Sequence, residues 1–160
     1  MFRTHRLITE LAVPRPLDEV FAFFADAGNL ERLTPPWLKF RILTPGPIEM
    51  REGTLIDYRL SLHGIPIPWR TRITRWEPPH AFADQQLWGP YLLWHHTHTF
   101  EAVPRGTLCR DVVDYKVLGG ALVERLLVRR DLRRIFTYRQ QAMLEAFGAP
   151  PPGPLAVQFS

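Results

Sequence analysis

Two histidines separated by a single residue are the feature of this sequence that most strongly suggests chemistry. His96 and His98 stand between Trp94 and Phe100 in a run that alternates with a period of two, which is typical of a β-strand. Alternate residues of a strand point to the same face, so all four side chains are expected to face the same way. The two aromatic residues indicate that this is the inner face. His96 and His98 would then orient a ligand, act as acid and base, or simply hydrogen-bond to each other, to carboxylates or to buried water.

Two aspartates are placed to partner these histidines. Asp84 lies in the strand pattern before the histidine run, and Asp111 lies in the strand pattern after it. In an antiparallel meander both patterns flank the histidine strand, so Asp–His pairs can form on the inner face. A carboxylate buried without a partner is very costly, which favours such pairs. Each pair is either a base with the group that orients it or a satisfied polar core, and both interpretations stay open.

Zinc binding is the other chemistry that neighbouring histidines suggest. His96 and His98 on one face could chelate zinc with Asp111 as a third ligand. No Cys–Cys or His-x-x-x-His framework accompanies them, and His95 is expected to face the opposite way. We therefore predict no metal and no other cofactor.

A further charged residue falls among apolar ones near the C-terminus. Arg139 lies on the apolar stripe of a helical pattern, where an arginine extends to solvent, pairs with an inner carboxylate or meets an anionic ligand. The candidates for ligand binding are Tyr58, Gln86, Trp88, Trp94, His96, His98, Phe100, Asp111, Tyr115 and Arg139. The candidates for catalysis are His96, His98, Asp84 and Asp111.

The periodicity of apolar residues outlines the elements that must hold these side chains. Strands are expected at residues 2–13, 39–44, 53–62, 69–76, 82–88, 92–103 and 107–117, and short helices at 17–24 and 30–33. Residues 121–147 contain no glycine or proline and repeat apolar residues every three or four positions, which predicts a helix of about seven turns. Its apolar stripe is expected to begin with Leu122 and Leu126.

This element order predicts an α+β fold. About seven antiparallel strands form a curved sheet around the long C-terminal helix, and two short helices follow the first strand. A sheet must cover its apolar face, and the long helix is the element able to do so. A hollow between the two is a common place for a ligand.

The element order and four segments resemble the START/Bet v 1-like helix-grip superfamily, also called SRPBCC or polyketide cyclase/dehydrase-like proteins. The resemblance covers residues 2–147. The segments are 16–21 with Phe24 and residues 29–30; Thr-Pro-Pro at 34–36; Asp-Gln-Gln at 84–86 with Gly-Pro at 89–90 and Trp-x-His-x-His-x-Phe at 94–100; and Gly-Thr at 106–107 with Asp-x-Val-x-Tyr at 111–115. The third segment also looks like SRPBCC domains fused to nucleotide-sugar epimerase-like proteins.

The resemblance implies a helix-grip fold with an internal cavity. It implies less about function, because members bind lipids, sterols, polyketides or hormones, and some are cyclases, dehydratases or cochaperones. It also implies that Trp37, Trp69 and the hairpin at residues 64–68 lie near the mouth of the cavity.

Length and composition favour a single domain. The 160 residues fit one domain at 1–147, followed by a proline-rich tail at 148–160 that is expected to be extended or mobile. The only cysteine is Cys109, the first 13 residues lack a signal-peptide pattern, and no apolar run reaches about 18 residues, so we expect a cytoplasmic protein without stable membrane insertion. The net charge of +4 comes with arginines that lack interleaved aromatic residues, and we expect no nucleic-acid partner. The sequence carries no signal for an oligomeric state.

Three functions fit these observations. We interpret the chain as a non-enzymatic binder or carrier of a small hydrophobic ligand of lipid, polyketide or aromatic type. The first alternative is a cyclase or dehydratase that uses His96 or His98 with Asp84 or Asp111, in which His98→Ala would abolish turnover and leave the melting temperature nearly unchanged. The second alternative is a protein-interaction module that uses the basic helix and the proline-rich tail.

Overall fold

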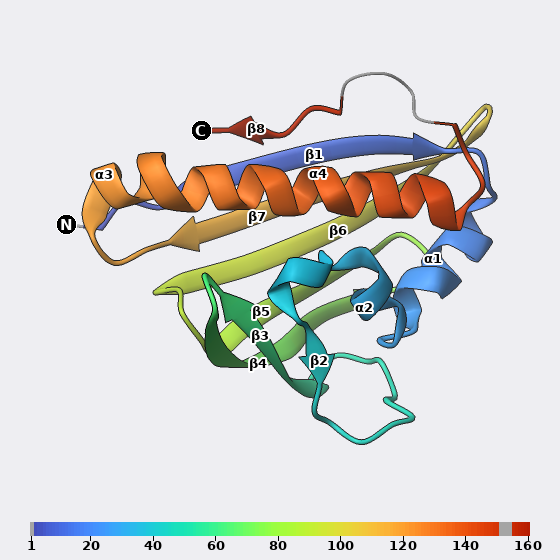
Figure 1. The fold of residues 1–160 in the computed structure, drawn as a ribbon. Coiled ribbons are helices and arrows are strands. Elements are labelled where there is room, and N and C mark those ends of the chain that lie inside the picture. The colour runs from blue at the N-terminus through green and yellow to red at the C-terminus, as the bar shows by residue number, and fades with distance from the viewer. Residues whose placement is uncertain (1, 151–154) are drawn as a thin grey trace.

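Within residues 2–150 and 155–160, which the computed structural model describes, eight strands form one antiparallel sheet in the order β2-β3-β4-β5-β6-β7-β1-β8 (Figure 1). The strands are β1 (His5–Val13), β2 (Arg41–Ile42), β3 (Leu55–Leu62), β4 (Ile65–Glu77), β5 (Ala81–Trp88), β6 (Leu93–Val103), β7 (Gly106–Lys116) and β8 (Gln158–Phe159). Strands β2 to β6 each pair with the next strand along the chain, which confirms the expected meander, and β7 pairs on its other side with β1.

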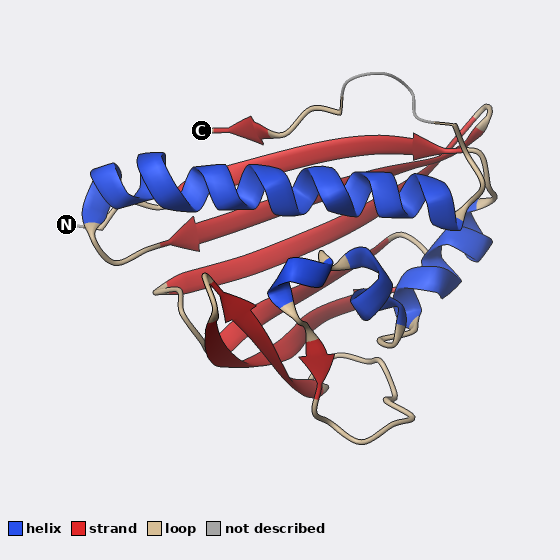
Figure 2. Ribbon diagram, in the orientation of Figure 1, coloured by secondary structure: helices blue, strands red, loops and turns tan. Residues whose placement is uncertain are grey.

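The helices lie on one side of this sheet (Figure 2). The short ones are α1 (Leu17–Ala25), α2 (Asn29–Leu33) and the single 3-10 turn η1 (Pro36–Leu38). The long C-terminal helix consists of α3 (Gly120–Val123), the π-helical turn η2 (Glu124–Val128) and α4 (Arg129–Ala146). In Figure 1, α4 crosses in front of β1 and β7, while α1 and α2 stand near one end and the lower part of the sheet. The expected helix-grip fold is confirmed.

Strand β4 begins earlier than its sequence suggests. The turn is confined to His63 and Gly64, both at positive φ, and the chain is extended from Ile65 onward. Pro66 and Pro68 are tolerated because β5 pairs with β4 only from Arg70, so the proline side of this stretch needs no hydrogen-bonded neighbour. Register shifts between residues 70 and 71 and between 73 and 75 then bend β4, which helps to curve the sheet.

The buried apolar residues form two clusters along the sheet. One cluster, beside α1 and the end of α4, is dominated by interlocking phenylalanines such as Phe21, Phe24, Phe82 and Phe100. The other cluster lies under the middle of α4 and holds Tyr58, Trp69, Trp94, Tyr115, Leu132 and Phe136. The phenylalanine cluster closes one end of the space between the sheet and the helix.

The first turns of the C-terminal helix bury other residues than the apolar ones expected from the sequence. Leu122 and Leu126 are 71% and 59% exposed, whereas Glu124 is only 2% exposed. The π-helical turn at 124–128 inserts an extra residue relative to α-helical spacing, so the stripe that is buried at Leu132 does not continue to Leu122 and Leu126. The apolar stripe was therefore predicted correctly from Leu132 to Phe147 and wrongly before it.

The far end of the C-terminal tail belongs to the sheet. Residues 151–154 lie outside the described residues, but β8 pairs antiparallel with β1, and Val157 is buried. Phe159 packs beneath the guanidinium groups of Arg129 and Arg133 at 5.2 and 5.1 Å. The sheet thus has one strand more than expected. No helix in the described ranges is both long enough and apolar enough to cross a bilayer.

Candidate functional site

The register of three neighbouring strands brings the predicted histidines and aspartates together. Asp84 of β5 stands opposite His96 of β6, and Asp111 of β7 stands opposite His98 of β6. His96, His98 and Asp111 are all buried, so the alternation of β6 was read in the correct register. The short hairpin turns set this register. A slip of one residue would move every side chain of a strand to the opposite face of the sheet, so the buried face also holds the register in place.

Each histidine is hydrogen-bonded to a carboxylate. His96 Nε2 lies 2.8 Å from Asp111 Oδ1, His98 Nδ1 lies 2.9 Å from the same oxygen, and His98 Nε2 lies 3.1 Å from Asp84 Oδ2. The two imidazole rings stack with centroids 3.7 Å apart. On its other face, His98 stacks on Phe82 at 4.1 Å. The rings are therefore held by packing as well as by hydrogen bonds.

Arg139 of α4 completes this cluster from the opposite wall. Its Nε lies 3.4 Å from Asp111 Oδ2, and its guanidinium stands 5.5 Å from the centre of the Phe24 ring. Of the three roles open to this arginine, pairing with an inner carboxylate is the one observed. Its NH2 group is also 3.4 Å from His98 Nδ1. The shorter contact of that nitrogen with Asp111 identifies Nδ1 as a donor, so the arginine only approaches it closely.

Burial and neighbouring charges shift the pKa values of the two histidines in opposite directions. Burial, aided by the neighbouring His98, lowers the pKa of His96 to about 4, so this ring is neutral at pH 7. Burial also opposes the charge on His98, but its hydrogen bonds to Asp111 and Asp84 outweigh that effect and raise its pKa.

The two carboxyl groups remain ionised for a similar reason. Burial would raise the pKa of Asp111, but the charge of Arg139 and the bonds from both histidines hold it well below its usual range. Burial would likewise raise the pKa of Asp84, and the bond from His98 lowers it. Two ionised carboxylates then face the guanidinium group of Arg139 and the rings of both histidines.

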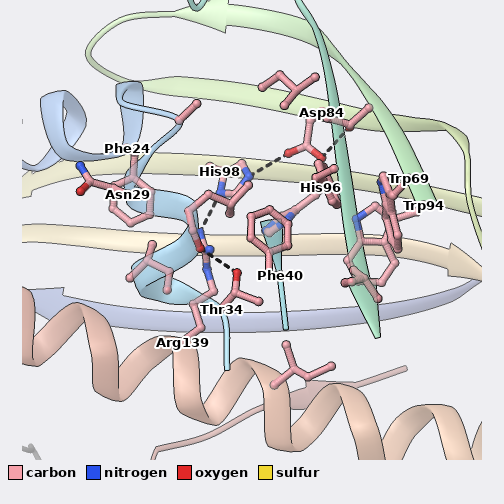
Figure 3. A pocket seen from close by; sticks show the side chains of 18 of the residues that line it. Phe24, Asn29, Thr34, Phe40, Trp69, Asp84, Trp94, His96, His98 and Arg139 are labelled. Carbon is pink, nitrogen blue, oxygen red and sulfur yellow. Dashed lines mark hydrogen bonds and ion pairs between the residues drawn. The ribbon is translucent and has the colours of Figure 1, made fainter. Parts of the chain in front are cut away.

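The cluster forms part of the wall of a cavity of about 180 Å³ (Figure 3). The remaining wall is mostly apolar and comes from α2, η1, the loop before β2, and β3, β4, β6 and α4. It includes Leu33, Leu38, Phe40, Ile56, Leu60, Trp69, Trp94, Leu132, Ile135 and Phe136. A few polar groups converging on an apolar hollow are typical of a small-molecule site.

Six of the proposed site residues line this cavity. They are Tyr58, Asp84, Trp94, His96, His98 and Arg139. Asp111 lies behind the histidines and touches the cavity only through them. Phe100 packs within the phenylalanine cluster instead.

Three other candidates lie away from the cavity. Gln86 hydrogen-bonds to the backbone of Tyr91 at 2.7 and 3.2 Å and so braces the turn between β5 and β6. Trp88 is 60% exposed. The hydroxyl of Tyr115 donates to Glu124 at 2.7 Å, and Arg129 donates to the same carboxylate. These three residues do not line the cavity, because face alternation alone does not show where along a strand the hollow lies.

Trp69 was expected at the cavity mouth, and the structure places it in the wall. It is 6% exposed and packs against Tyr58 and Trp94, and its indole N–H has no hydrogen-bond partner among the described residues. The alternation of Trp69, Thr71 and Ile73 was the signal that could have found this face. The sequence carried no comparable signal that Phe40 and the short helices line the cavity, because their position against the sheet depends on tertiary packing.

A sheet wrapped around a long helix, with an apolar hollow between them, defines the helix-grip class of ligand-binding proteins. Residues 13–144 match the family described as polyketide cyclase / dehydrase and lipid transport. The chain therefore belongs to this family, within the START/Bet v 1-like superfamily.

Solved structures agree with this fold. The Zhui aromatase/cyclase from Streptomyces sp. R1128 superposes with a TM-score of 0.71 at 17% identity, over 91% of this chain and 94% of that one. The ginseng major latex-like protein 151 from Panax ginseng gives 0.66 at 12% identity, over 90% and 97%.

A third likeness is closer in sequence. The nucleoside-diphosphate sugar epimerase from Corynebacterium glutamicum is 26% identical with a TM-score of 0.63, over 86% of this chain but only 28% of the epimerase. This agrees with the resemblance of residues 84–100 to epimerase-fused domains. No curated protein matches the sequence.

Proposed function

We propose that this protein binds a small, mainly apolar ligand in the cavity between the sheet and α4. The observation that carries this proposal is the apolar hollow itself, which ends on a compact group of polar side chains. The phenylalanine cluster closes one end, while His96, His98 and Arg139 supply the polar wall. A ligand would bury its apolar body against Leu132 and Phe136 and direct one polar group toward the histidines.

The volume of the cavity limits the size of this ligand. An apolar cavity of about 150 Å³ in another protein takes benzene, whereas drug-sized ligands occupy about 300–1,000 Å³. At about 180 Å³, the cavity suits one substituted ring or a short aliphatic chain. A multi-ring polyketide or a full lipid would require the cavity to enlarge.

His96 favours a ligand that carries a hydroxyl group. Its Nε2 donates to Asp111, and the ring is neutral, so Nδ1 is left as a hydrogen-bond acceptor. A phenol-type hydroxyl would donate to that nitrogen while its ring lies against the apolar wall.

The test is calorimetric titration of metal-free protein with phenol, 2-naphthol and 9-anthrol, which contain one, two and three rings. We expect phenol to bind and the three-ring compound to bind at least tenfold more weakly, because it exceeds the cavity. Leu132→Phe fills the cavity and should abolish phenol binding, whereas Leu122→Phe, on the exposed side of the same helix, should leave it unchanged.

Thermal melting of both variants separates loss of binding from loss of fold, since overpacking costs about 1–3 kcal/mol. Failure of every compound to bind, or equal phenol binding by Leu132→Phe and the wild type, would refute the proposal.

A second candidate is acid–base catalysis on the bound molecule, which is favoured by the contact of both Asp–His pairs with the cavity. Mass spectrometry of recovered ligand distinguishes the two. A binder returns its ligand unchanged. A dehydratase, or a cyclase that also dehydrates its product, returns a molecule lighter by one water, whereas a cyclase that only closes a ring by aldol addition returns an isomer of the same mass with a different fragmentation pattern.

A further inference from the structure

The two histidines are held in an orientation that suits metal ligands. A single oxygen, Asp111 Oδ1, accepts hydrogen bonds from His96 Nε2 and His98 Nδ1 at 2.8 and 2.9 Å. The second nitrogen of each ring, His96 Nδ1 and His98 Nε2, is therefore the one free of Asp111. Histidines that bind metals characteristically donate their other N–H to a carboxylate in this way.

Asp84 supplies a third group beside them. Ligand atoms of Asp84, His96 and His98 all lie within 4.8 Å of one another. His98 Nε2 and Asp84 Oδ2 are hydrogen-bonded at 3.1 Å, and a metal ion bound by both atoms would take the place of the hydrogen in this bond. Ligands of one zinc ion, at about 2.0–2.2 Å from it, are roughly 3–3.5 Å apart, so a small rotation of these side chains brings them into range.

The supporting contacts are also present. Asp111 is held by Arg139 at 3.4 Å and by the hydroxyl of Thr9 at 3.3 Å. The Thr71 hydroxyl donates to Asp84 Oδ1 at 3.3 Å, which leaves Oδ2 facing His98. Each ligand therefore has a partner that fixes its direction, as a preorganised metal site requires.

We propose that Asp84, His96 and His98 bind a divalent transition-metal ion, of which Zn²⁺ is the type, on the wall of the cavity. Two imidazoles and one carboxylate suit such an ion better than Mg²⁺ or Ca²⁺, which prefer oxygen ligands. Three protein ligands leave at least one coordination position directed into the cavity. Asp111, which the sequence suggested as a ligand, instead positions the two histidines.

The site can be tested with metal alone, so its outcome is independent of the proposed ligand. The full chain is stripped with a chelator and titrated with Co²⁺, whose visible d–d absorption reports its coordination. We expect a band that saturates at one equivalent and is displaced by Zn²⁺. Absence of a band would overturn the proposal even if phenol binds.

Matched variants assign the ligands. Asp84→Asn keeps the shape of the side chain but removes its charge and replaces one acceptor oxygen by an NH2 donor, and it should weaken Co²⁺ binding at least tenfold. Asp111→Asn should weaken it about 10–100-fold through the orientation of the histidines. His95→Asn, next to the site on the outer face of β6, should bind as the wild type does. Equal binding by wild type and Asp84→Asn, or equal losses in Asp84→Asn and His95→Asn, would contradict the assignment.

A measurement on the wild type guards against variants that do not fold. Proton NMR of the Co²⁺ form should show two strongly shifted exchangeable signals, from the N–H groups that His96 and His98 donate to Asp111. A Co²⁺ form without such shifted N–H signals would place the ion elsewhere and overturn the proposal.

Discussion

His98 connects two carboxylates that lie on different strands. Its ring bonds to Asp84 of β5 and Asp111 of β7, and it is 5% exposed. Asp111 is itself buried, and the side chain of Asp84 is only 17% exposed, so both carboxylates are largely removed from solvent. The histidine is therefore a structural element of the sheet as well as a wall of the cavity.

We predict that His98→Ala lowers the free energy of unfolding by about 3–5 kcal/mol, because removing one member of a buried ion pair leaves the other uncompensated. Urea unfolding at pH 7 measures this loss. His95→Ala, on the outer face of the same strand, should change stability by no more than about 0.5 kcal/mol. The catalytic alternative instead expects the melting temperature of His98→Ala to stay nearly unchanged, and equal stability of both variants would favour that alternative.

At the scale of elements, the π-helical turn of the C-terminal helix decides what its first turns bury. It brings Glu124 inward, where Tyr115 and Arg129 hydrogen-bond to its carboxylate and His5 lies 3.8 Å away. Burial would raise the pKa of Glu124, but these partners lower it. The helix start is thereby attached to β7 by a polar cluster separate from the cavity.

We predict a pH-dependent contribution of Glu124 to stability. A carboxyl group whose pKa is lowered by folding stabilises the protein above its unfolded pKa of about 4.3, and this contribution is lost as the pH falls through the lower folded value. Glu124→Gln should therefore cost about 1–3 kcal/mol at pH 7, and the difference from wild type should shrink toward zero as the pH falls from about 6 to about 3.

The measurement is urea unfolding of both proteins at matched pH values. Comparing the difference between the two proteins cancels the titration of the other carboxyl groups. A gap that stays constant, or widens, as the pH falls would show that the charge of Glu124 is not what attaches the helix.

At the scale of the whole molecule, the two ends of the described chain meet at one edge of the sheet. Ser160 exchanges two backbone hydrogen bonds of 2.9 Å with Arg6, and β8 covers the first half of the outer edge of β1 (Figure 1). A free edge strand exposes unpaired backbone groups and favours association with other chains. The last residues thus protect the sheet.

We predict that deleting residues 155–160 lowers the melting temperature and increases aggregation on heating. The deletion exposes surface covered by Val157 and Phe159, and burial of one such side chain is worth about 1.5–3 kcal/mol. Val157→Ala should produce a smaller loss without exposing the backbone of β1. Thermal melting with light scattering checks both effects, and an unchanged melting temperature of the deletion would show that β8 adds no stability.

The sequence by itself determined the meander from β2 to β7, the long C-terminal helix with its buried stripe from Leu132 onward, and the inner face of β6. Strand alternation has a period of two, and short hairpin turns fix the register, so His96, His98, Asp84 and Asp111 had to meet. These relations are local, because each depends on residues close in the sequence or on neighbouring strands.

Only the tertiary structure decided the extent of the cavity and the roles of its members. The position of Trp69 depends on how β4 bends, the burial of Glu124 on a π-helical turn, and the place of β8 on contacts with β1 far away in sequence. Asp111 likewise positions both histidines because α4 brings Arg139 against it. Such features arise from packing between segments that are distant in the sequence. The periodicity of apolar residues within one segment carries no information about that packing.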